Sequence, residues 1–146
     1  MITESEVQAL FDSGFDCSQI VLAEVSEELG MTREEAYRVA ACFGIGMAQE
    51  GVCGAATGAM IALGIRFGND VPGDYKTKMK IFDLRDEFIR RFREINGKVN
   101  CPELIGVKVH TLKETALAEP GTFDKCPLYC INSIRILKEL LTDRTS

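Results

Sequence analysis

Cysteines are the residues of this chain that point most directly to chemistry, because the sequence holds six of them and a single histidine. Four lie within a residue or two of an expected helix N-terminus: Cys17, Cys53, Cys101 and Cys126. The free N–H groups and the positive dipole end of a helix favour a thiolate there. Four converging helix starts would form an electropositive pocket that lowers thiol pKa values or holds a thiolate–metal assembly. These four cysteines are therefore the candidate catalytic and metal-ligating residues.

The other two cysteines, Cys42 and Cys130, lie outside this group. Cys42 falls at an expected helix end, and Cys130 lies one helical turn after Cys126. Either could be a buried core residue, and Cys130 could also reach the pocket. We expect Cys42→Ser to leave redox or cluster chemistry largely intact.

Very small residues follow Cys53 and predict a helix with a flat face. Gly54, Gly58 and Ala62 recur every four positions, which places them on one side of a helix. Glycine costs about 1 kcal/mol in a helix interior, so the face indicates close approach by another helix or by a bulky cofactor. Gly54 and Gly58 are therefore candidate cofactor-binding residues. The alternative is a tightly packed core helix whose cysteine is simply a small hydrophobe.

The residues before this helix form a glycine-rich loop. Gly44, Gly46 and Gly51 can adopt positive φ angles where other residues cannot. A glycine-rich loop gives access, and a helix N-terminus stabilises a thiolate. Cys53 is therefore expected to be the most reactive of the cysteines.

The periodicity predicts an all-α, single-domain bundle over residues 1–146, with five main helices plus one or two short ones. Two helix starts have the spacing of a capping box, Thr3 with Glu6 and Thr32 with Glu35. The expected helical segments are about 3–13, 16–30, 32–44, 53–67, 74–96, 100–104 and 124–141, and 112–118 could also be helical. The tail, 142–146, is expected to fray.

The longest segment, 74–96, carries an apolar stripe at spacings of three and four: Ile81, Leu84, Phe88, Phe92 and Ile95. Met79, Phe82 and Ile89 widen the stripe. Three arginines near its C-terminal end, Arg90, Arg91 and Arg93, could bind an anion or form a solvated helix end.

Charge and composition exclude several classes of partner. A net charge of −5 argues against nucleic acid, whose phosphates need a basic surface. No apolar run reaches the roughly 18 residues that span a bilayer, and the acidic start at 1–6 lacks the features of a signal peptide. We therefore expect a cytoplasmic protein without a membrane partner. A reducing cytosol disfavours structural disulfides, so six cysteines indicate metal binding or thiol chemistry.

The spacing of the four cysteines disfavours the commonest cysteine sites. Zinc ribbons and thioredoxin-type proteins use a C-x-x-C pair, and this chain has none. His110 is the only base for a Cys–His nucleophilic pair, and nothing in the sequence places it near a cysteine.

The cysteine pattern resembles a family named as redox-active proteins after the pattern C…GCAxxG…C…C. The central motif is Cys53-Gly54-Ala55-Ala56-Thr57-Gly58. The other cysteines of the pattern match Cys17, Cys101 and Cys126, so the resemblance extends over nearly the whole chain. It implies a small helical protein with a redox function.

Three interpretations stay open. The four thiols could perform redox chemistry as dithiol/disulfide pairs, as in an oxidoreductase. They could instead ligate an iron–sulfur cluster, for which four cysteines are the usual ligands. Alternatively, the protein is a helical binding or scaffold module in which the cysteines pack. The redox partner is unknown, and an oligomer is possible.

Overall fold

The computed structural model describes residues 1–142, and the predicted tail lies outside them apart from Thr142. Within this range the chain is all-α, with eight α-helices, one 3-10 turn and no strand, which confirms the predicted fold class. The elements are α1 Glu4–Asp12, α2 Cys17–Glu24, α3 Arg33–Val39, η1 Ile45–Ala48, α4 Gly54–Phe67, α5 Tyr75–Asn96, α6 Cys101–Ile105, α7 Leu112–Ala116 and α8 Cys126–Thr142. None of these helices is both long and apolar enough to cross a membrane.

Local capping fixes several helix starts. The Thr3 hydroxyl accepts a hydrogen bond from the Glu6 N–H at 3.2 Å, and Thr32 accepts one from Glu35 at 3.1 Å. Both predicted capping boxes are therefore present. Asp74 caps α5 through the Thr77 N–H at 3.1 Å.

Helices α2 and α3 end earlier than the sequence predicts, and a serine hydroxyl binds a backbone carbonyl near each end. The Ser26 hydroxyl donates to the Ala23 carbonyl at 2.7 Å, where α2 ends at Glu24 and not near residue 30. The Ser18 hydroxyl donates to the Ala40 carbonyl at 2.9 Å, where α3 has already ended at Val39.

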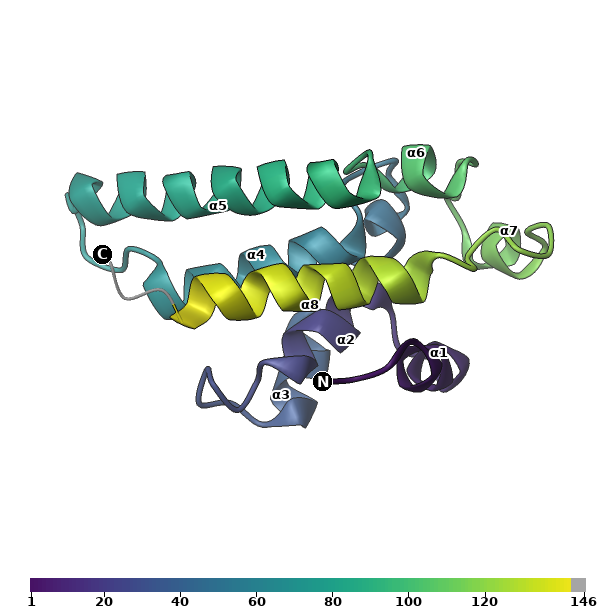
Figure 1. Cartoon of the computed structure of the whole chain (residues 1–146), viewed down its shortest axis with the longest axis horizontal. Helices are drawn as coiled ribbons and strands as arrows, with labels where there is room; N and C mark the ends of the chain where they lie inside the picture. The colour runs from purple at the N-terminus through teal and green to yellow at the C-terminus, as the bar shows by residue number, and fades with distance from the viewer. Residues whose placement is uncertain (143–146) are drawn as a thin grey trace.

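Helix α4 lies at the centre of the bundle and contacts α2, α5 and α8 (Figure 1). Its buried residues are all small or aliphatic, including Ala55, Ala59 and Leu63. The large side chains that complete the core come from its neighbours, with Phe88 and Phe92 on α5 fully buried. A helix this poor in side chains lets three others approach it closely, which is why it can form the centre.

The apolar stripe of α5 is only partly buried. Phe88 and Phe92 enter the core as predicted, but Met79 is 61% exposed and Ile95 is 54% exposed. Phe82 lies between Lys78 and Arg85, whose cations approach its ring centroid to 4.5 and 4.2 Å. The stripe therefore packs along its middle and not along its full length.

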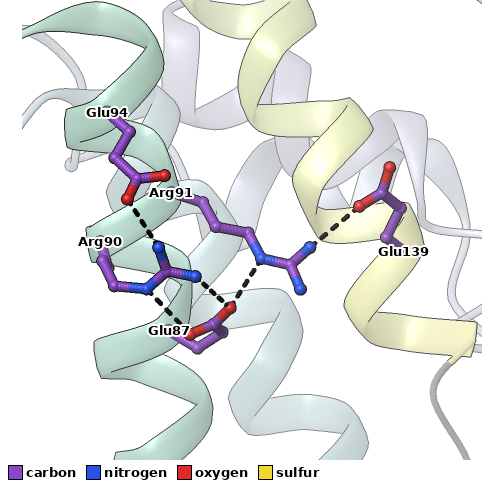
Figure 2. Close-up of polar contacts among 5 residues, drawn as sticks. All are labelled: Glu87, Arg90, Arg91, Glu94 and Glu139. Carbon is purple, nitrogen blue, oxygen red and sulfur yellow. Dashed lines mark hydrogen bonds and ion pairs between the residues drawn. The ribbon is translucent and has the colours of Figure 1, made fainter.

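Two of the three arginines near the end of α5 bind carboxylates (Figure 2). Arg90 lies between Glu87 and Glu94, and Arg91 joins Glu87 to Glu139 on α8. These two guanidinium groups lower the pKa of Glu87 to about 2. This supports a solvated helix end over an anion site, and exposed pairs of this kind contribute little stability each.

The flat face of α4 packs against the start of α2, as the small residues predict. A Cβ atom at Gly58 would lie 2.6 Å from the Ser18 carbonyl oxygen, which belongs to the α2 backbone. At Gly54, a Cβ atom would collide with the Cys17 sulfur. The close approach of α2 and α4 therefore requires glycine at both positions.

We predict that Gly58→Ala destabilises the fold by about 1–3 kcal/mol, because the added methyl group forces two helix backbones apart. Gly64→Ala on the same helix is the matched control. It meets no atom within 4 Å outside its own helix, so it should be neutral or stabilising. Urea denaturation measures both variants. A Gly58→Ala protein as stable as the Gly64→Ala protein would contradict the packing.

Candidate functional site

Four helix starts carry the four cysteines that the sequence singles out. Cys17, Cys101 and Cys126 are the first residues of α2, α6 and α8, and Cys53 is the N-cap of α4. In Figure 1, α4 and α8 begin at the end of the molecule where α6 and α7 lie, and run from there toward the opposite end. The predicted placement at helix N-termini is confirmed.

An isolated antiparallel bridge, which the sequence does not reveal, brings two of these helix starts together. Val52 pairs with Asn100, the residues just before Cys53 and Cys101. The Cys53 N–H donates to the Val99 carbonyl, and the Cys101 N–H donates to the Gly51 carbonyl, both at 2.8 Å. The bridge thus fixes two segments that lie almost 50 residues apart in the sequence. Each cysteine directly follows a paired residue, so the bridge also holds the two cysteines near each other.

The 3-10 turn η1 covers the start of α2 and has an uncommon backbone. Its residues Ile45, Gly46, Met47 and Ala48 have φ values of 54°, 59°, 58° and 53°. Left-handed geometry costs about 1–2 kcal/mol for each non-glycine residue, and such strain concentrates at functional sites. Gly46 takes the positive φ that the sequence predicts, whereas Gly44 and Gly51 do not.

Two contacts explain what this turn does. The Ile45 N–H donates a hydrogen bond to the Cys17 sulfur. A Cβ atom at Gly46 would lie 2.9 Å from Cβ of Cys101 and 2.7 Å from the Gly51 carbonyl oxygen. The turn therefore touches two of the four cysteine positions and supplies a donor to one of them.

The four cysteines line one cavity of about 360 Å³. Most of the other residues that line the cavity are apolar: Phe11, Phe15, Ile45, Leu104, Ile105, Leu112, Phe123 and Tyr129. The polar side chains Gln8, Asp16 and Thr115 complete the wall. The expected grouping of the four cysteines in one pocket is thus confirmed. What each of them does there stays a prediction.

Cys17 and Cys53 form the closest pair at this cavity. The Cys53 thiol hydrogen-bonds to the Cys17 sulfur, and the N–H groups of Ile45 and Ser18 add two more donors. Together they lower the pKa of Cys17 below its ordinary value of 9.0, although burial opposes the shift. The hydrogen bond with Cys17 and the burial of Cys53 raise the pKa of Cys53 well above that value.

The remaining pair, Cys101 and Cys126, stays protonated at neutral pH. Burial and the charge of Cys17 raise the pKa of Cys101 to about 11. Burial, together with Cys17, Cys101 and Asp124, raises the pKa of Cys126 to about 12. The expectation that four helix starts lower every thiol pKa is therefore wrong for three of the four. The hydrogen bond with Cys17 and then burial raise the pKa of Cys53, and burial is the main cause at Cys101 and Cys126. Because the pKa of Cys17 is lowered and that of Cys53 is raised, Cys17 and not Cys53 is the thiol that ionises most readily.

The two outlying cysteines lie elsewhere. Cys130 is completely buried in the core, and the cavity wall does not include it. Cys42 is exposed, so its interpretation as a core residue is wrong. His110 contacts Glu50 at 3.3 Å and Glu114 at 3.9 Å, so its polar contacts are with carboxylates.

The described residues contain no ready-made site for a single metal ion. Across residues 1–142, no three His, Cys, Asp or Glu side chains lie close enough together to hold a metal ion. The four cysteines therefore surround a space and do not meet at a point. Gly54 and Gly58, the candidate cofactor-binding residues, contact Cys17 and Ser18 of α2.

Comparison with protein families gives one match. The family described as "Putative redox-active protein (C_GCAxxG_C_C)" matches residues 15–140. The chain belongs to this family. A search of the curated proteins and a search of the solved structures find no match.

The family pattern and the cavity coincide in this redox-active protein. All four cysteines of the pattern line the cavity, and Gly54, which follows Cys53 in the central motif, contacts Cys17. Gly58, which ends the motif, keeps α2 against α4. The motif thus joins a thiol of the cavity to the packing that holds it.

We predict that Cys17 reacts first when the reduced protein meets iodoacetamide. The thiolate is the nucleophile, so the lowered pKa makes Cys17 ionise and react at a lower pH than the other three thiols of the cavity, and its rate should be half-maximal below pH 9. Cys101 and Cys126 should gain reactivity only toward pH 11 and 12. Peptide mass spectrometry after short exposures resolves each site, with exposed Cys42 as the reference. Modification of Cys101 or Cys126 before Cys17 would contradict this order.

Proposed function

We propose that this protein performs thiol–disulfide exchange, with Cys17 as the attacking thiolate and Cys53 as the resolving thiol. The observation that carries the proposal is the pairing of these two thiols at the wall of one cavity, where the hydrogen bond between them shifts both pKa values in opposite directions. Exchange requires one activated sulfur and a second within bonding reach, and close sequence spacing is only one way to arrange this. Here a helix contact replaces the C-x-x-C motif.

The first step joins Cys17 to the substrate. The Cys17 thiolate attacks one sulfur of a disulfide R–S–S–R, so a Cys17–S bond forms while the substrate S–S bond breaks. One R–S⁻ leaves and takes up a proton from water. The Ile45 and Ser18 N–H groups hold the Cys17 sulfur in place before the attack.

The second step oxidises the protein. Cys53 gives its proton to solvent, and its sulfur attacks Cys17. The Cys17–Cys53 bond forms, the mixed disulfide breaks, and the second R–S⁻ leaves. The substrate has then gained two electrons, and the protein dithiol has lost them. A dithiol reductant returns the pair to thiols by the reverse exchange.

The roles of Cys101 and Cys126 follow from their position. Both line the same cavity as protonated thiols, so they can take over the disulfide by a further exchange or receive the reductant. Oxidation of Cys17 removes the charge that raises both of their pKa values, which would make them more reactive once the first pair is oxidised.

An iron–sulfur cluster is the second candidate, supported by the presence of four cysteines on one cavity wall. Anaerobic reconstitution with iron and sulfide, followed by visible absorbance, is the experiment that would favour it. We propose a cytoplasmic location with an unidentified redox partner for either chemistry.

We predict a stoichiometric difference between two single variants in a Cys42→Ser background, which removes the exposed thiol. With excess dipyridyl disulfide, the parent should rapidly release two equivalents of thiopyridone, because Cys53 resolves the mixed disulfide. Cys53→Ser should stop after one rapid equivalent and keep the adduct on Cys17. Cys17→Ser should lose the rapid phase altogether.

Absorbance of the released product and the mass of the intact protein measure both quantities. If Cys53→Ser rapidly released two equivalents of thiopyridone, Cys53 would not be the resolving thiol. If Cys17→Ser rapidly released thiopyridone, the proposed exchange reaction would be wrong.

A further inference from the structure

The side chains that line the cavity and its volume determine which molecules can reach the thiols. Half-buried rings from three separate elements face it: Phe11 on α1, Phe15 after α1, and Phe123 before α8. Phe15 is held in place by stacking on Tyr37, with ring centroids 3.9 Å apart. Leu104 and Ile105 of α6 add aliphatic surface. A volume of about 360 Å³ falls in the range of small-molecule sites and is far too small for a folded protein loop.

The charges at the wall are all negative. Within residues 1–142, no lysine, arginine or histidine lines the cavity, and Asp16 is its single carboxylate. The Asp16 side chain lies next to Cys17 in sequence and raises the pKa of that thiol by repulsion. An anionic molecule that enters would meet Asp16 and the Cys17 thiolate without a cation to offset them.

We propose that the substrate is a small, neutral, ring-bearing disulfide and that the cavity rejects anionic disulfides. This inference rests on the proposed thiol exchange and names its substrate class. The rings of Phe11, Phe15 and Phe123 supply apolar surface to a bound ring, and Asp16 supplies the repulsion that excludes carboxylates. The thiol pair at the wall then meets the disulfide bond between the two rings.

The test separates binding from redox chemistry by using molecules without a reactive bond. Dipyridylethane has two neutral rings at about pH 8, joined by two carbons in place of the two sulfurs. Bibenzyl-4,4′-dicarboxylate also has two rings joined by two carbons, and it carries two carboxylates. Calorimetry on the reduced full chain should show dipyridylethane binding at least about tenfold more tightly than bibenzyl-4,4′-dicarboxylate. Bound dipyridylethane should slow iodoacetamide modification of Cys17 and leave that of Cys42 unchanged.

Variants assign the preference to this cavity. Phe11→Ala should weaken dipyridylethane binding by about tenfold. Phe82→Ala on α5 removes the same side chain away from the cavity and should have no effect. Asp16→Asn should reduce the difference in binding affinity between the neutral and the dianionic molecule. Asparagine is also suited to an N-cap, so the start of α2 should be kept.

Three results would overturn the inference: equal or tighter binding of bibenzyl-4,4′-dicarboxylate, no binding of dipyridylethane at millimolar concentration, or an equal effect of Phe11→Ala and Phe82→Ala. Selective binding of dipyridylethane by a protein that fails to release thiopyridone would support the ligand class and remove the exchange reaction. The two proposals can therefore fail separately.

Discussion

The contact between α2 and α4 is the constraint on which the rest of the structure depends. It forms only because Gly54 and Gly58 have no side chain, so the backbone at Ser18 and the sulfur of Cys17 can lie directly on α4. The same contact places Cys17 beside Cys53, which begins the small-residue helix. Packing of the core and assembly of the site are thus one event, and each glycine of the motif serves both.

Burial gives the four thiols different properties. Cys17 receives several hydrogen-bond donors, two of them backbone N–H groups, which lower its pKa. The hydrogen bond with Cys17 is the main cause that raises the pKa of Cys53, whereas burial is the main cause at Cys101 and Cys126. A cavity with an apolar wall, and with no cation lining it within residues 1–142, therefore holds one thiol that ionises more readily than the other three. This asymmetry suits exchange chemistry, which needs a nucleophile and a resolving thiol that does not compete with it. The strained turn η1 contributes the donor at Ile45.

Helix positions and the cysteine grouping could be predicted from the sequence because their signals are local or repeat at a fixed spacing. Thr3 and Glu6 predict a capping box, and Gly54 and Gly58 predict a close contact, without reference to distant residues. The bridge between Val52 and Asn100 could not be predicted, because a single residue pair leaves no periodic pattern. The thiolate was expected at Cys53 because a helix start is visible in a sequence, whereas burial by distant side chains is not.

Disulfide mapping of the oxidised protein tests the central claim most directly. The Cys42→Ser chain is equilibrated in buffers of oxidised and reduced dithiothreitol, trapped with acid and digested for mass spectrometry. The account predicts that the first disulfide to form in a single two-electron transition joins Cys17 to Cys53. A first disulfide that joins Cys101 to Cys126, or a protein that stays fully reduced under oxidising conditions, would contradict it.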